Sequence, residues 1–258
     1  MSPVPAGLYA LEHEPYDDDA PLVVLVHGTL DRSAAFGRTV QRLSDLHVIV
    51  YDRRGYGRSA AAQPPASTLE DHATDLISIL DGRPATVVGH SYGGVVALVA
   101  AGQRPDLIVA VGVFESPMPW APWWPAEADE GMAMFATSMD DPSRVAEAFF
   151  RRVAGDAAWD ELPERTRDDR RSEGRALVAD IGSLRDIDAP FDLSALTVPL
   201  IVGRGSESMG YQRAGARRMA EEAGVELVEI SGGAHGSHTT HPDEFAAFAR
   251  RAVELGRA

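Results

Sequence analysis

Six short apolar runs rich in valine and isoleucine recur along the chain and alternate with segments of helical periodicity. Near-continuous apolar runs of this length are typical of parallel strands that are covered on both faces. Strands that alternate with helices predict an α/β fold, in which a mostly parallel, doubly wound sheet has helices on both faces. The predicted strands are 21–28, 47–52, 85–91, 107–115, 198–204 and 225–230, and the predicted helices are 33–46, 67–80, 93–103, 211–224 and 242–255.

One long segment, residues 117–190, has helical patterns but no strand pattern. A segment of this length is too long for an ordinary connection between a strand and a helix, so we expect a helical insert. The insert would divide a single α/β core into residues 1–116 and 191–258. It holds all four tryptophans of the chain: Trp120, Trp123, Trp124 and Trp159.

The aromatic residues of this insert have two expected uses. Most of them are expected to fill the small core of the insert itself. Ligands of open α/β sheets, however, bind at the carboxyl ends of the strands, and the insert must face that edge. Some of its apolar side chains are therefore expected to line a pocket, and the candidates for substrate contact are Met118, Trp120 and Trp124.

Charge and composition exclude several classes of function. With 24 Lys and Arg residues against 39 Asp and Glu, the formal net charge is −15, which argues against nucleic acid or an anionic membrane as a partner. The chain has no cysteine, so thiolate nucleophiles and zinc–thiolate sites are excluded. No uncharged apolar run approaches ~18 residues and no secretory signal is present, so we expect a cytoplasmic protein without a membrane segment. The oligomeric state stays open.

The strongest chemical signal is the stretch VVGHSYGG, residues 87–94. It contains G-x-S-x-G centred on Ser91, at the end of one predicted strand and directly before a predicted helix. The small flanking residues permit a sharp turn that lifts the hydroxyl of Ser91 clear of the sheet. The helix that follows points its N-terminus at the site, where backbone N–H groups stabilise developing negative charge. The stretch therefore predicts a nucleophilic serine on a nucleophile elbow.

Together with three further motifs, this elbow resembles the α/β-hydrolase fold superfamily. LVHGTLDRSAAF resembles the family's oxyanion loop, YDRRGYGRSA its D-x-R-G-x-G-x-S segment, and GGAHGSHTTHPDEF the loop with the catalytic histidine. The resemblance covers nearly the whole chain apart from the insert, which resembles the family's cap domain. It implies a sheet of about eight strands and a structural turn, not a phosphate site, at the second motif. It also implies an oxyanion hole made by the backbone N–H groups of Tyr92 and Thr29.

Three histidines near the C-terminus compete for the role of general base: His235, His238 and His241. The family places its catalytic histidine after the last strand, about seven residues before a helix-opening proline, and His235 has that spacing to Pro242. The resemblance therefore implies that His235 is the base and that the other two are rim or capping residues. The i, i+3, i+6 spacing also permits a metal site. No carboxylate at a clear ligand spacing completes it, so we predict no metal and no cofactor.

The acid of the triad has two candidates. The family's usual aspartate position is occupied here by Ser206, which carries no charge to stabilise an imidazolium. Glu207 follows directly, whereas Glu115 ends a predicted strand at the same carboxyl edge as Ser91 and His235. Some superfamily members carry their acid at this alternative position, and VFESPMPW resembles the segment found in them. We therefore favour Glu115 and keep Glu207 as the alternative.

The resemblance implies a serine hydrolase that cleaves an ester, thioester or lactone of a moderately apolar small molecule. Its Ser-His-Glu catalytic triad would act through an acyl-enzyme. A carbon–carbon bond hydrolase, an acyltransferase and a perhydrolase reuse the same triad and stay as alternatives. A non-catalytic ligand-binding protein on the same fold is a further alternative, which the serine at position 206 would favour.

Overall fold

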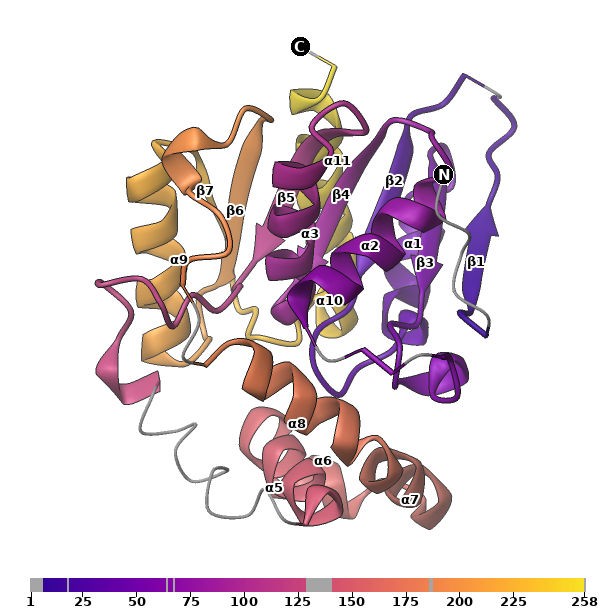
Figure 1. The fold of residues 1–258 in the computed structure, drawn as a ribbon, viewed down its shortest axis with the longest axis vertical. Helices are drawn as coiled ribbons and strands as arrows, with labels where there is room; N and C mark the ends of the chain where they lie inside the picture. Colours follow the sequence, from indigo (N-terminus) through magenta and orange to yellow (C-terminus); the bar gives the residue numbers. More distant parts are fainter. Residues whose placement is uncertain are drawn as a thin grey trace.

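The computed structural model describes residues 7–17, 19–63, 65–66, 68–128, 141–185 and 188–257. Its centre is a sheet with the strand order β1-β3-β2-β4-β5-β6-β7 (Figure 1). Every neighbouring pair is parallel except β1 with β3, so the predicted α/β fold is confirmed. The described part has seven strands, where about eight were expected: β1 (Ala10–His13), β2 (Leu22–Val26), β3 (His47–Tyr51), β4 (Ala85–His90), β5 (Ile108–Phe114), β6 (Leu200–Gly205) and β7 (Leu227–Ile230).

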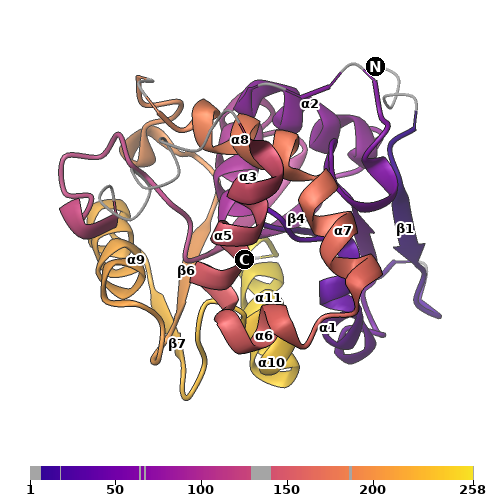
Figure 2. The same ribbon diagram turned by 90° about the horizontal axis from the view of Figure 1, so that it is seen from below.

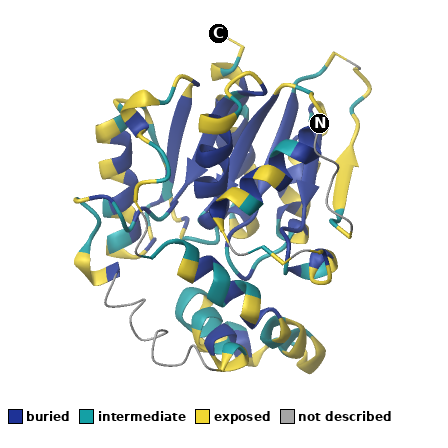
Figure 3. Cartoon of the chain, viewed as in Figure 1, coloured by how far each residue is buried: buried dark blue, intermediate teal, exposed yellow. Residues whose placement is uncertain are grey.

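The edge strand β1 is the one that the apolar runs did not predict. All of its residues are exposed, and it pairs antiparallel with β3 at the outer edge of the sheet (Figure 3). Its sequence, ALEH, has no continuous apolar run because neither face of the strand is buried. A strand of this kind is held by backbone hydrogen bonds to its neighbour, which leave no hydrophobic pattern in the sequence.

Two apolar cores lie on opposite faces of the sheet. Alternate residues of β2 enter them: Val24 packs in one core, and Val23 and Leu25 pack in the other. This two-sided burial explains why the central strands are continuous apolar runs. One face is covered by α2 (Leu69–Leu80), α3 (Tyr92–Gln103) and α9 (Gly210–Ala223), and the other by α1 (Gly37–Arg42) and α11 (Pro242–Leu255).

The predicted helices are present, with shifted ends. The segment predicted as a helix over 33–46 is shorter than expected, because it is a 3-10 turn followed by α1, which ends at Arg42. In α2, the side chain of Thr68 accepts a hydrogen bond from the N–H of Asp71, and the Asp71 side chain accepts one in return. The remaining short elements are η1 (Ser33–Phe36), η2 (Gly57–Ser59), η3 (Leu193–Ala195) and α10 (Ser237–Thr240).

Four helices lie across the carboxyl edge of the sheet and are called the cap below (Figures 1 and 2). They are α5 (Pro142–Ala154), α6 (Asp156–Asp160), α7 (Glu164–Ser172) and α8 (Gly174–Ser183). Their small apolar core includes Val145 and Leu177 together with Leu30 and Tyr56 from loops of the sheet domain. Trp159 is fully buried within the cap, against Phe150. No helix in the described ranges is long and apolar enough to cross a membrane.

Candidate active site

Ser91 lies on a sharp turn between β4 and α3. Its backbone has φ 53° and ψ −125°, a conformation that non-glycine residues rarely adopt. Its N–H donates to the carbonyl of Phe114 over 2.8 Å, which ties the turn to the neighbouring strand. A Cβ at Gly89 would overlap the carbonyl of Gly93, and a Cβ at Gly93 would overlap that of Val26. The glycines of the motif are therefore required for the strand and the helix to pack this closely.

The loop after β2 lies against this elbow. A Cβ at Gly28 would lie 2.9 Å from the Cβ of Ser91, so the backbone of this loop passes directly beside the nucleophile candidate. Leu30 has a positive φ of 56°, which turns the chain just after Thr29. Helix α3 begins at Tyr92, immediately after Ser91. The structure thus brings both predicted oxyanion donors, Tyr92 and Thr29, to the cavity that Ser91 lines.

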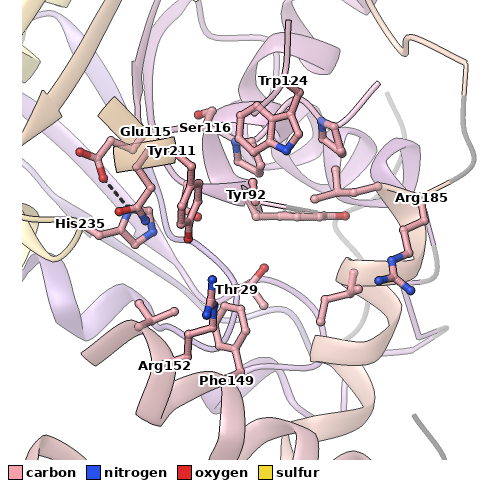
Figure 4. Close-up of a pocket in the computed structure, with 18 of the residues that line it drawn as sticks. Thr29, Tyr92, Glu115, Ser116, Trp124, Phe149, Arg152, Arg185, Tyr211 and His235 are labelled. Carbon is pink, nitrogen blue, oxygen red and sulfur yellow. Dashed lines mark hydrogen bonds and ion pairs between the residues drawn. The ribbon is translucent and has the colours of Figure 1, made fainter. Parts of the chain in front are cut away.

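Glu115 and His235 are joined by a short hydrogen bond. The Nδ1–H of His235 donates to Oε2 of Glu115 over 2.7 Å (Figure 4). The other oxygen, Oε1, accepts from the N–H of Gly205 over 2.7 Å, so both carboxylate oxygens are occupied. The Glu115 side chain is 0% exposed. His235 lines the cavity, and its second nitrogen, Nε2, forms no hydrogen bond with a described residue.

The strand register explains why these side chains meet. His90 at the end of β4 pairs with Phe114 at the end of β5, and Phe114 pairs with Gly203 on β6. Ser91 and Glu115 therefore follow neighbouring parallel strands at the same level. Ser91 and His235 both line the cavity, and no hydrogen bond joins these two described residues. This bond is commonly long in unliganded hydrolytic sites.

Glu207 is not brought to the imidazole. It is exposed, and its carboxylate accepts a hydrogen bond from the hydroxyl of Ser206 over 3.2 Å. Ser206 in turn accepts from the N–H of Gly232 over 2.8 Å, which ties the loop after β6 to the loop before His235. The serine at the usual acid position therefore has a structural contact, and Glu115 fills the space beside His235.

A cavity of about 670 Å³ lies between the sheet domain and the cap. Ser91, Glu115 and His235 line it, and so do Trp120 and Trp124, two of the three residues predicted to contact substrate. Met118 does not line the cavity, contrary to expectation: it is buried in the apolar core against the sheet. Residues that were not among the predicted substrate contacts also line the cavity: Phe149, Arg152, Ile181, Leu184, Arg185 and Tyr211.

Comparison with known proteins agrees with this geometry. The sequence profile of the Alpha/beta hydrolase family matches residues 23–248. The chain belongs to this family. RutD of Variovorax paradoxus, provisionally assigned as a carbamate hydrolase, is 29% identical over 94% of this chain and 93% of its own length. The lipase LipV of Mycobacterium tuberculosis is 34% identical, but the match covers only 37% of this chain and 38% of LipV. A hydrolase from Pseudomonas aeruginosa PA01 has the same fold, with a TM-score of 0.74 at 22% identity over 95% of this chain and 94% of that one.

In this α/β hydrolase, two further histidines support the loop that carries His235. The Nε2–H of His90 donates to the carbonyl of His235 over 2.8 Å. His238 is paired with Asp31 of the loop after β2, with Nε2 and Oδ2 2.9 Å apart. Burial lowers the pKa of His90 well below its ordinary value, and the nearby His238 and His235 lower it further. His90 is therefore neutral, which suits a residue that holds a carbonyl in place.

His241, the third candidate for the general base, lies near Thr240 with Nδ1 and Oγ1 2.9 Å apart.

Asp31, His90 and His238 have ligand-type atoms within 4.8 Å of one another, and could be considered for a metal. The rings of His90 and His238 lie in contact, with centroids 4.1 Å apart and planes tilted by 37°, and Nε2 of each already has a partner. Burial raises the pKa of Asp31, but the hydrogen bond and charge of His238 outweigh burial and hold that pKa well below its ordinary value. We interpret the cluster as a hydrogen-bonded pair of Asp31 and His238 beside the neutral ring of His90.

One buried carboxylate, which was not predicted from the sequence, joins the cap to the loop after β2. Oδ2 of Asp180, on α8, accepts hydrogen bonds from Thr29 Oγ1 over 2.8 Å, Tyr56 OH over 2.7 Å and Arg53 Nη2 over 2.6 Å. Burial raises the pKa of Asp180, but the charge of Arg53 and hydrogen bonds from His72 and Arg53 hold it well below its ordinary value. The arginine of the second motif is thus a buried structural residue. No sequence signal links it to a partner 127 positions away.

Proposed function

We propose that this α/β hydrolase is a serine hydrolase that cleaves an ester, thioester or lactone of a small molecule. Ser91 is the nucleophile, His235 the general base and Glu115 the acid of the triad. The observation that carries the proposal is the 2.7 Å hydrogen bond from His235 to the fully buried Glu115, in a cavity that Ser91 also lines. An imidazole held in this way has one fixed tautomer, and its Nε2 is left to accept a proton.

The reaction follows from these positions. Oγ of Ser91 attacks the substrate carbonyl while Nε2 of His235 takes the hydroxyl proton. The backbone N–H groups of Tyr92 and Thr29 hold the negative oxygen of the tetrahedral intermediate. The intermediate collapses to an acyl-enzyme, and His235 returns the proton to the departing alcohol or thiol. Water then attacks the acyl-enzyme with His235 again as base, which releases the acid and restores Ser91.

Glu115 supports this cycle through charge as well as position. Proton transfer to His235 creates an imidazolium, and the adjacent carboxylate stabilises that charge in a buried site where water does not screen it. The N–H of Gly205 fixes the carboxylate from the other side. The exposed Glu207 lacks both contacts, which favours Glu115 for this role.

The cavity suits a small organic substrate. Its wall combines the rings of Trp120, Trp124 and Phe149 with aliphatic side chains from the cap. A volume of about 670 Å³ lies in the range that holds drug-sized ligands. The relative RutD is provisionally assigned as a carbamate hydrolase, and a carbamate, like an ester, is cleaved at its carbonyl group. We therefore propose moderately apolar acyl compounds as substrates.

A fluorophosphonate probe tests this function directly, because it labels serines that are activated for attack. We expect the intact protein to gain the mass of one phosphonyl group and Ser91→Ala to gain none. Ser116→Ala is the matched control, since Ser116 is another serine that lines the cavity, and it should still be labelled. Absence of labelling in the wild type would favour a non-catalytic ligand-binding protein instead.

A further inference from the structure

We propose that the substrate carries a carboxylate, which Arg152 of the cap binds inside the active-site cavity. This inference rests on the proposed serine hydrolase function and specifies its substrate class. Arg152 lies in the last turn of α5, on the cap side of the cavity. Figure 4 shows its guanidinium directed into the cavity, toward the ring of Tyr211.

The charges of the cavity wall are the first support. Of the described residues that line it, Glu115, Arg152 and Arg185 are charged, and Arg185 already has an interaction partner. Both oxygens of Glu115 already accept hydrogen bonds, from His235 and Gly205, so this carboxylate is not a partner for either arginine. Among the described lining residues, Arg152 is therefore a positive charge that Glu115 does not neutralise, in a protein whose formal net charge is −15. A local reversal of sign of this kind attracts an anionic ligand to one place on an otherwise acidic molecule.

The contrast with other arginines of the cap is the second support. The cap arginines Arg151, Arg167, Arg170 and Arg171 each pair with at least one carboxylate. Arg152 forms no ion pair with any described residue, although it is only partly exposed. Arg144, Arg165 and Arg175 also lack such a pair, but all three are exposed to water. A partly buried cation without a counter-charge is costly, and a bound carboxylate would offset that cost.

Tyr211 supplies a second donor beside Arg152. Burial raises the pKa of Tyr211, while the charge and hydrogen bond of Arg152 act against that rise. The phenol stays protonated at neutral pH and can donate its hydrogen to an anion. A guanidinium donates two parallel N–H groups to one carboxylate, and such charge-assisted bonds are stronger than neutral ones. Arg152 and Tyr211 together offer donors for a carboxylate in the cavity that Ser91 also lines.

Two esters with the same leaving group test the inference: the mono-4-nitrophenyl ester of adipic acid, and the same compound with its free carboxylate capped as a methyl ester. We expect wild-type kcat/KM to be at least about tenfold higher for the anionic ester, because a charge-assisted contact is present only with it. Arg152→Met should reduce the ratio of the two kcat/KM values about tenfold, and Arg152→Lys should reduce it less. The ratio cancels any general loss of activity in these variants.

Arg175→Met is the matched control, since it removes one positive charge from the exposed surface of the same cap and should leave the ratio unchanged. A wild-type protein that cleaves both esters equally, or an Arg152→Met variant that keeps the wild-type ratio, would overturn the inference while leaving the serine hydrolase function intact. If neither ester is cleaved, the proposed ester-cleaving function is wrong. The carboxylate pocket is then tested separately by a binding measurement.

For that purpose, calorimetry on the Ser91→Ala protein compares monomethyl adipate, an anion, with the neutral dimethyl adipate. At least about tenfold tighter binding of the anion, lost when Arg152→Met is added, supports the carboxylate pocket. Equal binding of the two compounds would contradict it.

Discussion

At the residue scale, the site is built from unusual backbone conformations. Four described residues other than glycine have a positive φ, and three of them lie at the site: Leu30, which follows the proposed oxyanion donor Thr29, Ser91 and Glu115. Each such conformation costs about 1–3 kcal/mol. The N–H of Ser91 is bonded to the carbonyl of Phe114, and that of Glu115 to the carbonyl of Gly203. The central strands therefore hold these residues in place and offset the strain.

Substitution of a glycine in the Ser91 turn tests whether the strand and the helix must pack this closely. Gly89→Ala would place a methyl group on the carbonyl of Gly93, so we expect a loss of about 2–3 kcal/mol or more in the free energy of unfolding. Fluorophosphonate labelling of Ser91 should fall with it. Gly102→Ala is the control, because its Cβ meets nothing within 4 Å and alanine favours the helix by about 0.5–1 kcal/mol. Urea unfolding measures both, and equal stabilities of the two variants would contradict the packing argument.

At the element scale, the cap is held to the sheet domain by a buried charge pair. Asp180 of α8 and Arg53 of the loop after β3 are 2% and 0% exposed at their side chains. The same carboxylate accepts a hydrogen bond from the hydroxyl of Thr29, so a cap helix fixes the loop that bears a proposed oxyanion donor. Asp180 is a positioning residue in this account, since it acts on the reaction through Thr29.

Asp180→Asn should destabilise the protein by about 3–5 kcal/mol, because it leaves Arg53 buried without a counter-charge. Thermal unfolding followed by circular dichroism would measure the change. Asp168→Asn is the control: the Asp168–Arg171 pair of the cap is exposed, and its loss should leave the midpoint nearly unchanged. If both variants unfold at the wild-type temperature, the proposed anchoring of the cap is wrong.

The elements differ in how far the sequence predicts them. The strands of the sheet centre were predicted because both of their faces are buried, whereas the exposed β1 left no hydrophobic pattern. Motifs with fixed local spacing predicted the position of Ser91 at a strand end, which the structure shows. The contacts of Asp180 with Arg53 and Thr29 could not be predicted, because they join segments that only the folded cap brings together. The prediction that Met118 contacts substrate failed for the same reason, because its burial in the core depends on tertiary packing.

At the scale of the whole molecule, buried histidines link stability to pH. His27 donates from Nδ1 to the carbonyl of Gly28 and accepts from the N–H of Arg53 at Nε2, and this acceptor role requires the neutral ring. Burial, followed by the charge of Arg53, lowers the pKa of His27 to about 4. The pKa values of His72 and His90 are also lowered, chiefly by burial. These groups bind protons more readily in the unfolded chain than in the folded protein.

Stability from such groups is fully present above the unfolded histidine pKa of about 6.5 and is lost as the pH falls toward the folded value. His27 alone should reduce the free energy of unfolding by about 2 kcal/mol between pH 7 and pH 5. Asp75 and Glu173, whose pKa values are raised mainly by burial, act in the opposite direction. We expect the effect of the three histidines to outweigh that of the two carboxyl groups. The free energy of unfolding measured with urea should therefore be lower at pH 5 than at pH 7. Equal or greater stability at pH 5 would refute this balance.

The central claim is that Glu115, and not Glu207, is the acid of the triad. The most direct measurement is the turnover of a neutral 4-nitrophenyl ester by Glu115→Gln and Glu207→Gln, two isosteric changes that each remove one carboxylate. We predict that Glu115→Gln lowers kcat by about 10³–10⁴-fold, because the imidazolium of His235 loses its stabilising charge, while Glu207→Gln retains kcat within about twofold. Wild-type turnover in Glu115→Gln together with a collapse in Glu207→Gln would contradict the account.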